Sequence, residues 1–154
     1  MSIYGIMLEA KGTGEKETIP GLVFNKNFWQ KGISFLFAGK KRHVKLRIKG
    51  SKDKDISKNQ IKAYHFLITN QETISKKVVK LIISFSKSNT DEMKELKSEK
   101  EVSTDCVLKN IVIDQSGSCS LLFDSKSETK KGGDQGIGVR VYPSYSIDIQ
   151  AGVL

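Results

Sequence analysis

The chain has 154 residues, a formal net charge of +9 at pH 7 and a hydrophobic share of 38%. That length suits a single domain over residues 1–154, and the apolar share is enough for a core, which excludes disorder along the whole chain. No apolar run approaches the roughly 20 residues of a membrane helix, so we expect no membrane insertion. Residues 1–12 lack the basic start of a signal peptide, and a cytoplasmic protein is therefore expected.

The N-terminal part of the chain is predicted to be extended. Residues 3–8 (IYGIML) favour a buried strand, and residues 11–21 form a Gly-rich loop. Residues 22–29 are apolar but irregular, which is typical of an extended arm or a poor strand. Trp29 in this stretch is expected in the core, with an interface anchor as the alternative. Apolar alternation over residues 33–37 predicts a strand that pairs with the next one in a hairpin.

The most regular pattern is found in residues 43–49 (HVKLRIK), where apolar and basic residues alternate strictly. Because successive side chains of a strand point to opposite faces, this predicts a half-buried strand with a basic outer row. The surrounding residues 26–62 carry twelve Lys or Arg against two Asp, so the basic excess belongs to one region and can steer an anionic partner. The cations proposed as a binding face are Lys40, Lys41, Arg42, Lys45, Arg47 and Lys49.

A single helix is predicted over residues 57–70. Ser57 and Gln60 have the spacing of a capping box, which satisfies free amides at a helix start. Asn70 is a suitable end, because Asn tolerates the left-handed conformation in which many helices stop. The apolar residues at helical spacing that are expected to face the core are Ile61, Tyr64, His65 and Ile68.

A second strand is predicted directly after this helix, over residues 73–86 (TISKKVVKLIISFS). Apolar residues alternate in it from Val79 to Phe85, and Ile82 interrupts the polar side, which indicates a strand covered on both faces. Residues 87–101 are dense in charges of both signs, so a long solvated hairpin loop is expected there, with one short helical turn anchored by Met93 and Leu96 as the alternative.

The remaining residues predict more strands. The apolar alternations lie in residues 102–114, 119–123, 137–141 and 145–149, with Pro143 bending or interrupting the last stretch. Seven to eight strands with one helix predict a mostly-β fold, namely an antiparallel barrel or sandwich with the helix of residues 57–70 flanking it.

No catalytic or metal-binding motif is present, so we expect a protein that is not an enzyme and has no cofactor and no metal site. His43 is expected to be a solvated surface residue and His65 a hydrogen-bonded core residue. Residues 12–16 (GTGEK) lack the spacing of a phosphate-binding loop. For Cys106 and Cys119, free buried thiols are favoured in a reducing cytoplasm, although a hairpin would permit a disulfide; a zinc site lacks the paired spacing.

The basic row is the one candidate site. Sheet proteins that bind single-stranded nucleic acid usually place aromatic residues among the cations, because bases stack on them. The nearest aromatic residues here, Phe35 and Phe37, are expected to be buried. Nucleic acid is therefore a less favoured partner than the alternative, in which the basic surface faces solvent or another subunit.

The order of elements resembles a known family. The relevant segments are the 3–8 strand with the loop from Lys11 to Glu15, the helix in SKDKDISKNQIKAYHFLI, and the later segments VVKLIISFSK, CVLKNIVIDQ and SCSLLFDS, ending at Ser125. Together they are similar to the Hcp (haemolysin-coregulated protein) family, the tube protein of type VI secretion systems, which is related in fold to phage tail-tube proteins. The aromatic- and serine-rich segment that usually follows the first loop of that family is replaced here by GLVFNKNFW.

This resemblance implies a structural subunit that assembles into hexameric rings stacked as a hollow tube. The tube would carry effectors, contact spike or sheath proteins, act in virulence, and leave the cell through a dedicated secretion machine. The loop implied to reach a neighbouring subunit consists of Lys11, Gly12, Thr13, Gly14 and Glu15. The alternative function is a basic β-barrel binding module for nucleic acid or another anionic partner.

Overall fold

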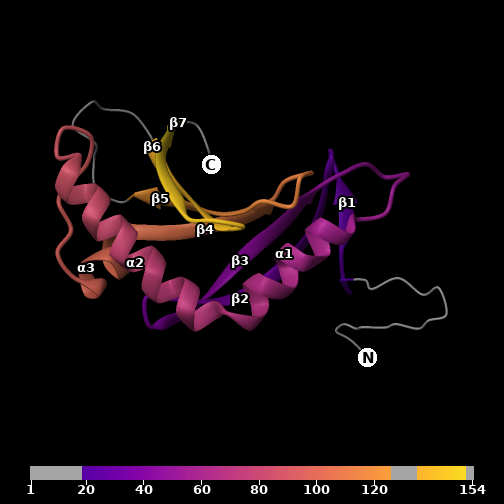
Figure 1. The fold of residues 1–154 in the computed structure, drawn as a ribbon, viewed down its shortest axis with the longest axis horizontal. Coiled ribbons are helices and arrows are strands. Elements are labelled where there is room, and N and C mark those ends of the chain that lie inside the picture. The colour runs from indigo at the N-terminus through magenta and orange to yellow at the C-terminus, as the bar shows by residue number, and fades with distance from the viewer. Residues whose placement is uncertain (1–18, 126–134, 152–154) are drawn as a thin grey trace.

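The computed structural model describes residues 19–125 and 135–151, which form one seven-stranded sheet and three helices (Figure 1). The strands are β1 (Val23–Asn25), β2 (Phe28–Phe37), β3 (Lys40–Lys49), β4 (Cys106–Ile113), β5 (Cys119–Ser125), β6 (Gln135–Tyr142) and β7 (Ser146–Ala151). The helices are α1 (Lys58–Thr69), α2 (Gln71–Ser88) and α3 (Glu99–Asp105). The strands lie side by side in chain order, and every pair is antiparallel except β3 with β4, because all three helices lie in the connection between these two.

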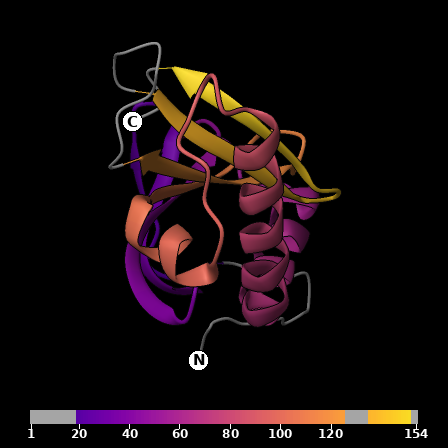
Figure 2. The same ribbon diagram turned by 90° about the vertical axis from the view of Figure 1, so that its left-hand side faces the viewer.

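The sheet is open and curves around the helices (Figure 2). Helix α2 contacts β2 near one side of the sheet and both β6 and β7 at the other. Over the described ranges, β1 and β7 are the two edge strands and do not pair with each other. The predicted antiparallel pairing is confirmed for most of the sheet, but the predicted barrel or sandwich with one helix is wrong. The fold is a mixed α/β fold in which helices, not further strands, cover one face of a single sheet.

The second predicted strand, residues 73–86, is part of α2. Ile74, Val78 and Ile82 are completely buried, and their spacing of four residues places them on one stripe of a helix. Lys80 lies on the exposed side between two of these turns. The alternation from Val79 to Phe85 is therefore incidental, and packing of the Ile74 stripe against the sheet determines the structure.

Helix α1 confirms the predicted helix and its capping box. The Ser57 hydroxyl accepts a hydrogen bond from the Gln60 amide, and the Gln60 side chain accepts one from the Ser57 amide. Asn70 ends the helix as predicted but with φ of −114°, so it does not use the left-handed conformation. The predicted apolar face is rotated relative to the observed one. The residues of α1 that are buried are Gln60, Ala63 and Leu67, whereas Ile61, Tyr64, His65 and Ile68 are half-buried.

The core lies between the inner face of the sheet and the helices. Phe37 and Phe123 contact each other there with ring centroids 4.9 Å apart. Other completely buried large residues are Phe35, Leu46, Ile48, Leu67, Ile74, Ile82, Leu96, Ile111, Ile113 and Leu121. Part of the core comes from the segment expected to be a loop, because Met93 and Leu96 in it are buried. Helix α3 begins at the end of that segment and also buries Val102. The strand predicted from residue 102 begins at Cys106 instead.

Helix α2 also protects the edge of β2. Strand β1 pairs only with Phe28–Gln30, so the rest of β2 has no strand on that side. The Leu36 amide donates to the Gln71 side-chain oxygen (2.9 Å), and the Ala38 amide donates to the Ser75 hydroxyl (2.8 Å). Backbone amides that would otherwise invite edge-to-edge association are thereby paired within the chain.

The turn between β4 and β5 is held by Asp114 and contacts the start of α1. The Asp114 carboxylate accepts hydrogen bonds from the Ser116 amide (3.0 Å) and the Ser118 amide (3.0 Å). Burial on its own would raise the pKa of Asp114, but the hydrogen bond from the Ser116 hydroxyl, together with those from the backbone amides of the turn, outweighs it and the pKa is lowered. Gly117 has a φ of +95°, and a Cβ placed there would lie 2.9 Å from the backbone oxygen of Asn59.

The two cysteines lie at opposite ends of the β4–β5 hairpin. Cys106 pairs with Ser125, and Cys119 pairs with Ile113. Both thiols are free and buried, as expected, and the disulfide alternative is wrong. Burial raises the pKa of each thiol to about 12, with a smaller effect from a neighbouring Asp carboxylate.

The strand expected at residues 3–8 and the loop from Lys11 to Glu15 lie outside the described residues. Within the described part of the chain, no helix is long and apolar enough to span a membrane.

Candidate anion-binding site on the outer face of the sheet

Strand β3 separates its apolar and basic residues as predicted. Val44, Leu46 and Ile48 are buried against the helices. The intervening side chains lie on the opposite face of the sheet, which none of the three helices covers (Figures 1 and 2). We call this outer surface the basic face; its residues are Lys41, His43, Lys45, Arg47 and Lys49. All of them are exposed except Arg47, which is half-buried, so the prediction of a solvated His43 is confirmed.

Arg42, which was predicted to belong to this face, points to the other side of the sheet. Its Nη2 donates to the Ser103 hydroxyl on α3 (2.8 Å), and its Nε donates to the Phe37 carbonyl oxygen (3.3 Å). Partial burial lowers the pKa of its guanidinium. Arg42 therefore fastens α3 to the β2–β3 hairpin. Lys40 was also predicted to belong to this face but is not part of it. It is exposed next to the turn at the start of β3.

An aromatic ring lies on the basic face and was missed from the sequence. Phe28 is the first residue of β2 and pairs with Lys49. The guanidinium carbon of Arg47 lies 4.0 Å from the centroid of the Phe28 ring. The prediction took residues 22–29 as an extended arm or a poor strand and did not assign Phe28 to a face of the sheet. Counting back from Ser34 in steps of two places Phe28 on the outer face, and this is the signal that could have found it. Phe35 and Phe37 are buried as expected.

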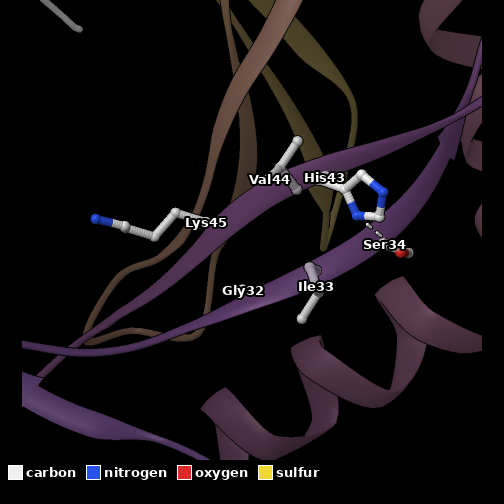
Figure 3. A pocket seen from close by; sticks show the side chains of 6 residues that line it. All are labelled: Gly32, Ile33, Ser34, His43, Val44 and Lys45. Carbon is white, nitrogen blue, oxygen red and sulfur yellow. Dashed lines mark hydrogen bonds between the residues drawn. The ribbon is translucent and has the colours of Figure 1, made fainter.

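Gly32 creates a shallow hollow in the middle of the basic face. It pairs with Lys45, and its neighbour Ser34 pairs with His43. Figure 3 shows the His43 imidazole beside Ser34, at 3.4 Å between Nδ1 and Oγ, and the Lys45 side chain extending away from it. The hollow has a volume of about 390 Å³, and a Cβ added to Gly32 would meet no atom within 4 Å. The surface is open where the strand lacks a side chain.

Among the described residues, the positive charge of the outer surface is concentrated at β3. Lys109 on β4 is also exposed beside it, but the outer surface farther along the sheet carries Asp124 on β5 and Asp148 on β7. Arg140 on β6 donates from Nε to the Ser144 carbonyl oxygen (3.1 Å) and from Nη2 to its hydroxyl (3.1 Å). The outer surface is thus polarised, with its basic end at β3 and acidic groups toward β7.

Other titratable groups are dispersed over the described fold. No cluster of three or more His, Cys, Asp or Glu side chains occurs among residues 19–125 and 135–151. His65 is half-buried on α1, with its ring centroid 5.7 Å from that of Tyr64. The basic face, in contrast, brings several cations together on one surface and can attract and hold anionic groups.

A family model described as "Domain of unknown function (DUF6985)" matches residues 18–128. The chain belongs to this family. The matched DUF6985 region extends from before β1 to just beyond β5, so it contains the whole basic face and all three helices. No curated protein and no solved structure matches the chain.

The segments that carry the resemblance to the Hcp family have mixed outcomes. The α1 helix and the strands β4 and β5 occur where they were expected. The segment VVKLIISFSK, expected as a strand, lies in α2. Assembly into rings and a tube stays a prediction.

Proposed function

We propose that this protein is a binding module that holds an anionic macromolecule on its basic face and performs no covalent chemistry. The observation that carries the proposal is that the side chains of the basic face follow one strand, β3. The residues between them point to the other side of the sheet and are completely or nearly completely buried. The fold supplies a rigid support for these side chains, because β3 pairs along its whole length with β2 and along part of it with β4.

Repulsion among the cations supports the same proposal. Alternate residues of a strand lie about 7 Å apart, so Lys45 repels Arg47, and Arg47 repels Lys49. At that distance two like charges in water repel by about 0.6 kcal/mol. A bound polyanion would reverse the sign of this contribution. The face is therefore more stable with an anionic partner than without one.

Heparin chromatography tests the proposal with matched variants. Lys45→Glu combined with Arg47→Glu reverses two charges on the basic face, and Lys76→Glu with Lys80→Glu reverses two exposed charges on α2. Both double variants have the same net charge. We expect the wild type and the α2 variant to elute at similar, elevated salt, and the basic-face variant to elute much earlier. Equal elution of the two variants would contradict the proposal.

A second candidate function is the tube subunit implied by the resemblance to the Hcp family. The observation that favours it is the open sheet: within the described residues, β1 and β7 have edges without a neighbouring strand. Pairing between copies of the chain at such edges would close a ring. Light scattering coupled to size-exclusion chromatography distinguishes a ring from a monomer, and electron microscopy would show annuli. A monomer at all accessible concentrations would contradict this second candidate.

A further inference from the structure

The basic face contains a planar stacking platform. The guanidinium carbon of Arg47 lies 4.0 Å from the centroid of the Phe28 ring. A guanidinium that stacks on a ring with one face can take another planar group on its other face. Bases of single-stranded nucleic acids stack on aromatic rings and on Arg guanidinium planes. An acidic peptide made of Asp and Glu has carboxylates but no planar ring system that could use this platform.

The hollow at Gly32 provides room next to the platform. Gly32 and Phe28 belong to the same face of β2, four residues apart, which is about 13 Å along a strand. Lys45 lies opposite the glycine, and both Ser34 and His43 border the hollow. A sugar or base over Gly32 would contact the strand closely and find hydrogen-bonding groups from Ser34 and His43 at its rim. Gly within a strand often marks such a close approach by a ligand.

A row of cations runs along β3 beside this platform. From Lys41 to Lys49, β3 spans about 27 Å, with a cation or imidazole at every second residue. The interval of about 7 Å is comparable to the separation of successive phosphates in an extended single strand. A chain of phosphates laid along β3 can therefore meet one side chain of the row per nucleotide.

Resting on the proposed function, we infer that the anionic partner is a single-stranded nucleic acid. Its phosphates follow β3, one base stacks on the Arg47–Phe28 platform, and a nucleotide about two positions along the strand occupies the hollow at Gly32. A duplex keeps its base faces inside its own stack and cannot use the platform. Charge alone would fit any polyanion; the platform and the hollow select for unstacked bases.

Fluorescence anisotropy with three polyanions tests this inference. The probes are a labelled oligothymidylate of about 12 nucleotides, a duplex of equal length, and poly-L-glutamate as competitor. We expect the single strand to bind more tightly than the duplex and to resist competition by poly-L-glutamate. Phe28→Ala is expected to weaken single-strand binding about 5- to 150-fold, the range observed when a stacking ring is removed.

Two variants test the contributions of the platform and of the hollow to binding without changing the net charge. Arg47→Lys keeps the positive charge but removes the planar group. Gly32→Leu fills the hollow without changing charge, and its Cβ would meet no atom within 4 Å. We expect each to weaken binding of the oligothymidylate about tenfold or more, and by a larger factor than it weakens binding of heparin. Circular dichroism and thermal unfolding establish that each variant is folded.

The outcomes distinguish the inference from the proposed function. If these variants bind the oligothymidylate as the wild type does, or if poly-L-glutamate competes equally, the nucleic-acid inference is overturned while anion binding stands. If the wild type binds neither heparin nor the oligothymidylate, both are overturned.

Discussion

The buried side chain of Gln60 joins the start of α1 to the ends of β3 and β4. Only 4% of this residue is exposed. Its Oε1 accepts a hydrogen bond from the Ser57 amide (3.0 Å), and its Nε2 donates to the carbonyl oxygens of Lys49 (2.7 Å) and Asp114 (2.9 Å). Both donors of the amide group and one of the two lone pairs of its oxygen are used within the chain. We therefore predict that Gln60 is among the most sensitive polar positions of the fold.

Replacement by methionine keeps the length of the side chain and removes all three hydrogen bonds. At about 1 kcal/mol for each bond, Gln60→Met should lower the free energy of unfolding by about 3 kcal/mol. The Asp114 carbonyl oxygen keeps a second hydrogen bond, from the Gly117 amide at 3.0 Å. Losing the bond from Gln60 to Asp114 should therefore cost the least of the three. Since a domain of this size has a total stability of about 5–15 kcal/mol, the change is easily measured. Urea unfolding followed by the fluorescence of Trp29, the single tryptophan, reports it.

Gln60→Glu adds a pH dependence with a defined sign. Its carboxylate would face two carbonyl oxygens, so the folded protein should raise the pKa of this Glu above its unfolded value of about 4.3. The folded state is then favoured below the unfolded pKa, and stability is lost as pH rises through the raised pKa. Gln30→Met is the control, because the Gln30 side chain makes one exposed hydrogen bond of 3.3 Å to Asn25. Wild-type stability of Gln60→Glu at pH 7 would refute this reasoning.

Three further predictions concern the same framework. Gly117→Ala should destabilise the fold by about 1–3 kcal/mol in urea unfolding, because its φ is positive and the new Cβ would strike Asn59; a neutral effect would contradict the observed contact. The lowered pKa of Asp114 means that its contribution to stability is present above the ordinary carboxyl pKa of 3.8 and is lost as pH falls through the lower folded value. Acid titration should therefore destabilise the wild type more steeply than Asp114→Asn, and parallel curves would refute this. Arg42→Ala should lower the melting temperature by removing the hydrogen bond to Ser103, yet elute from heparin later than Arg47→Ala; the reverse order would place Arg42 on the binding surface.

Some elements could be predicted because a local signal and the final packing agree. The capping box of Ser57 and Gln60 marks the start of α1 in the sequence, and the alternation in HVKLRIK fixes both faces of β3. In both segments, the local pattern requires no knowledge of distant residues.

The missed elements depend on tertiary contacts. The α2 segment contains an alternating and a helical apolar pattern at once, and only the presence of β2, β6 and β7 around Ile74 and Ile82 decides between them. Phe28 was missed because the turn at residues 26–27, where both residues have positive φ, splits the apolar stretch into two strands. Arg42 lies two residues before Val44, so extending the alternation of β3 to it would have placed it on the inner face; only its partner Ser103, 61 residues away in the chain, could not be predicted.

The central claim is that the basic face binds a polyanion, and the salt dependence of binding tests it most directly. The affinity for labelled heparin is measured at several salt concentrations for the wild type, Lys45→Ala with Arg47→Ala, and Lys76→Ala with Lys80→Ala. Each lost ionic contact reduces the slope of log affinity against log salt by about one unit. We predict a slope reduced by about one to two units in the basic-face variant alone. Equal slopes in all three proteins would contradict the claim.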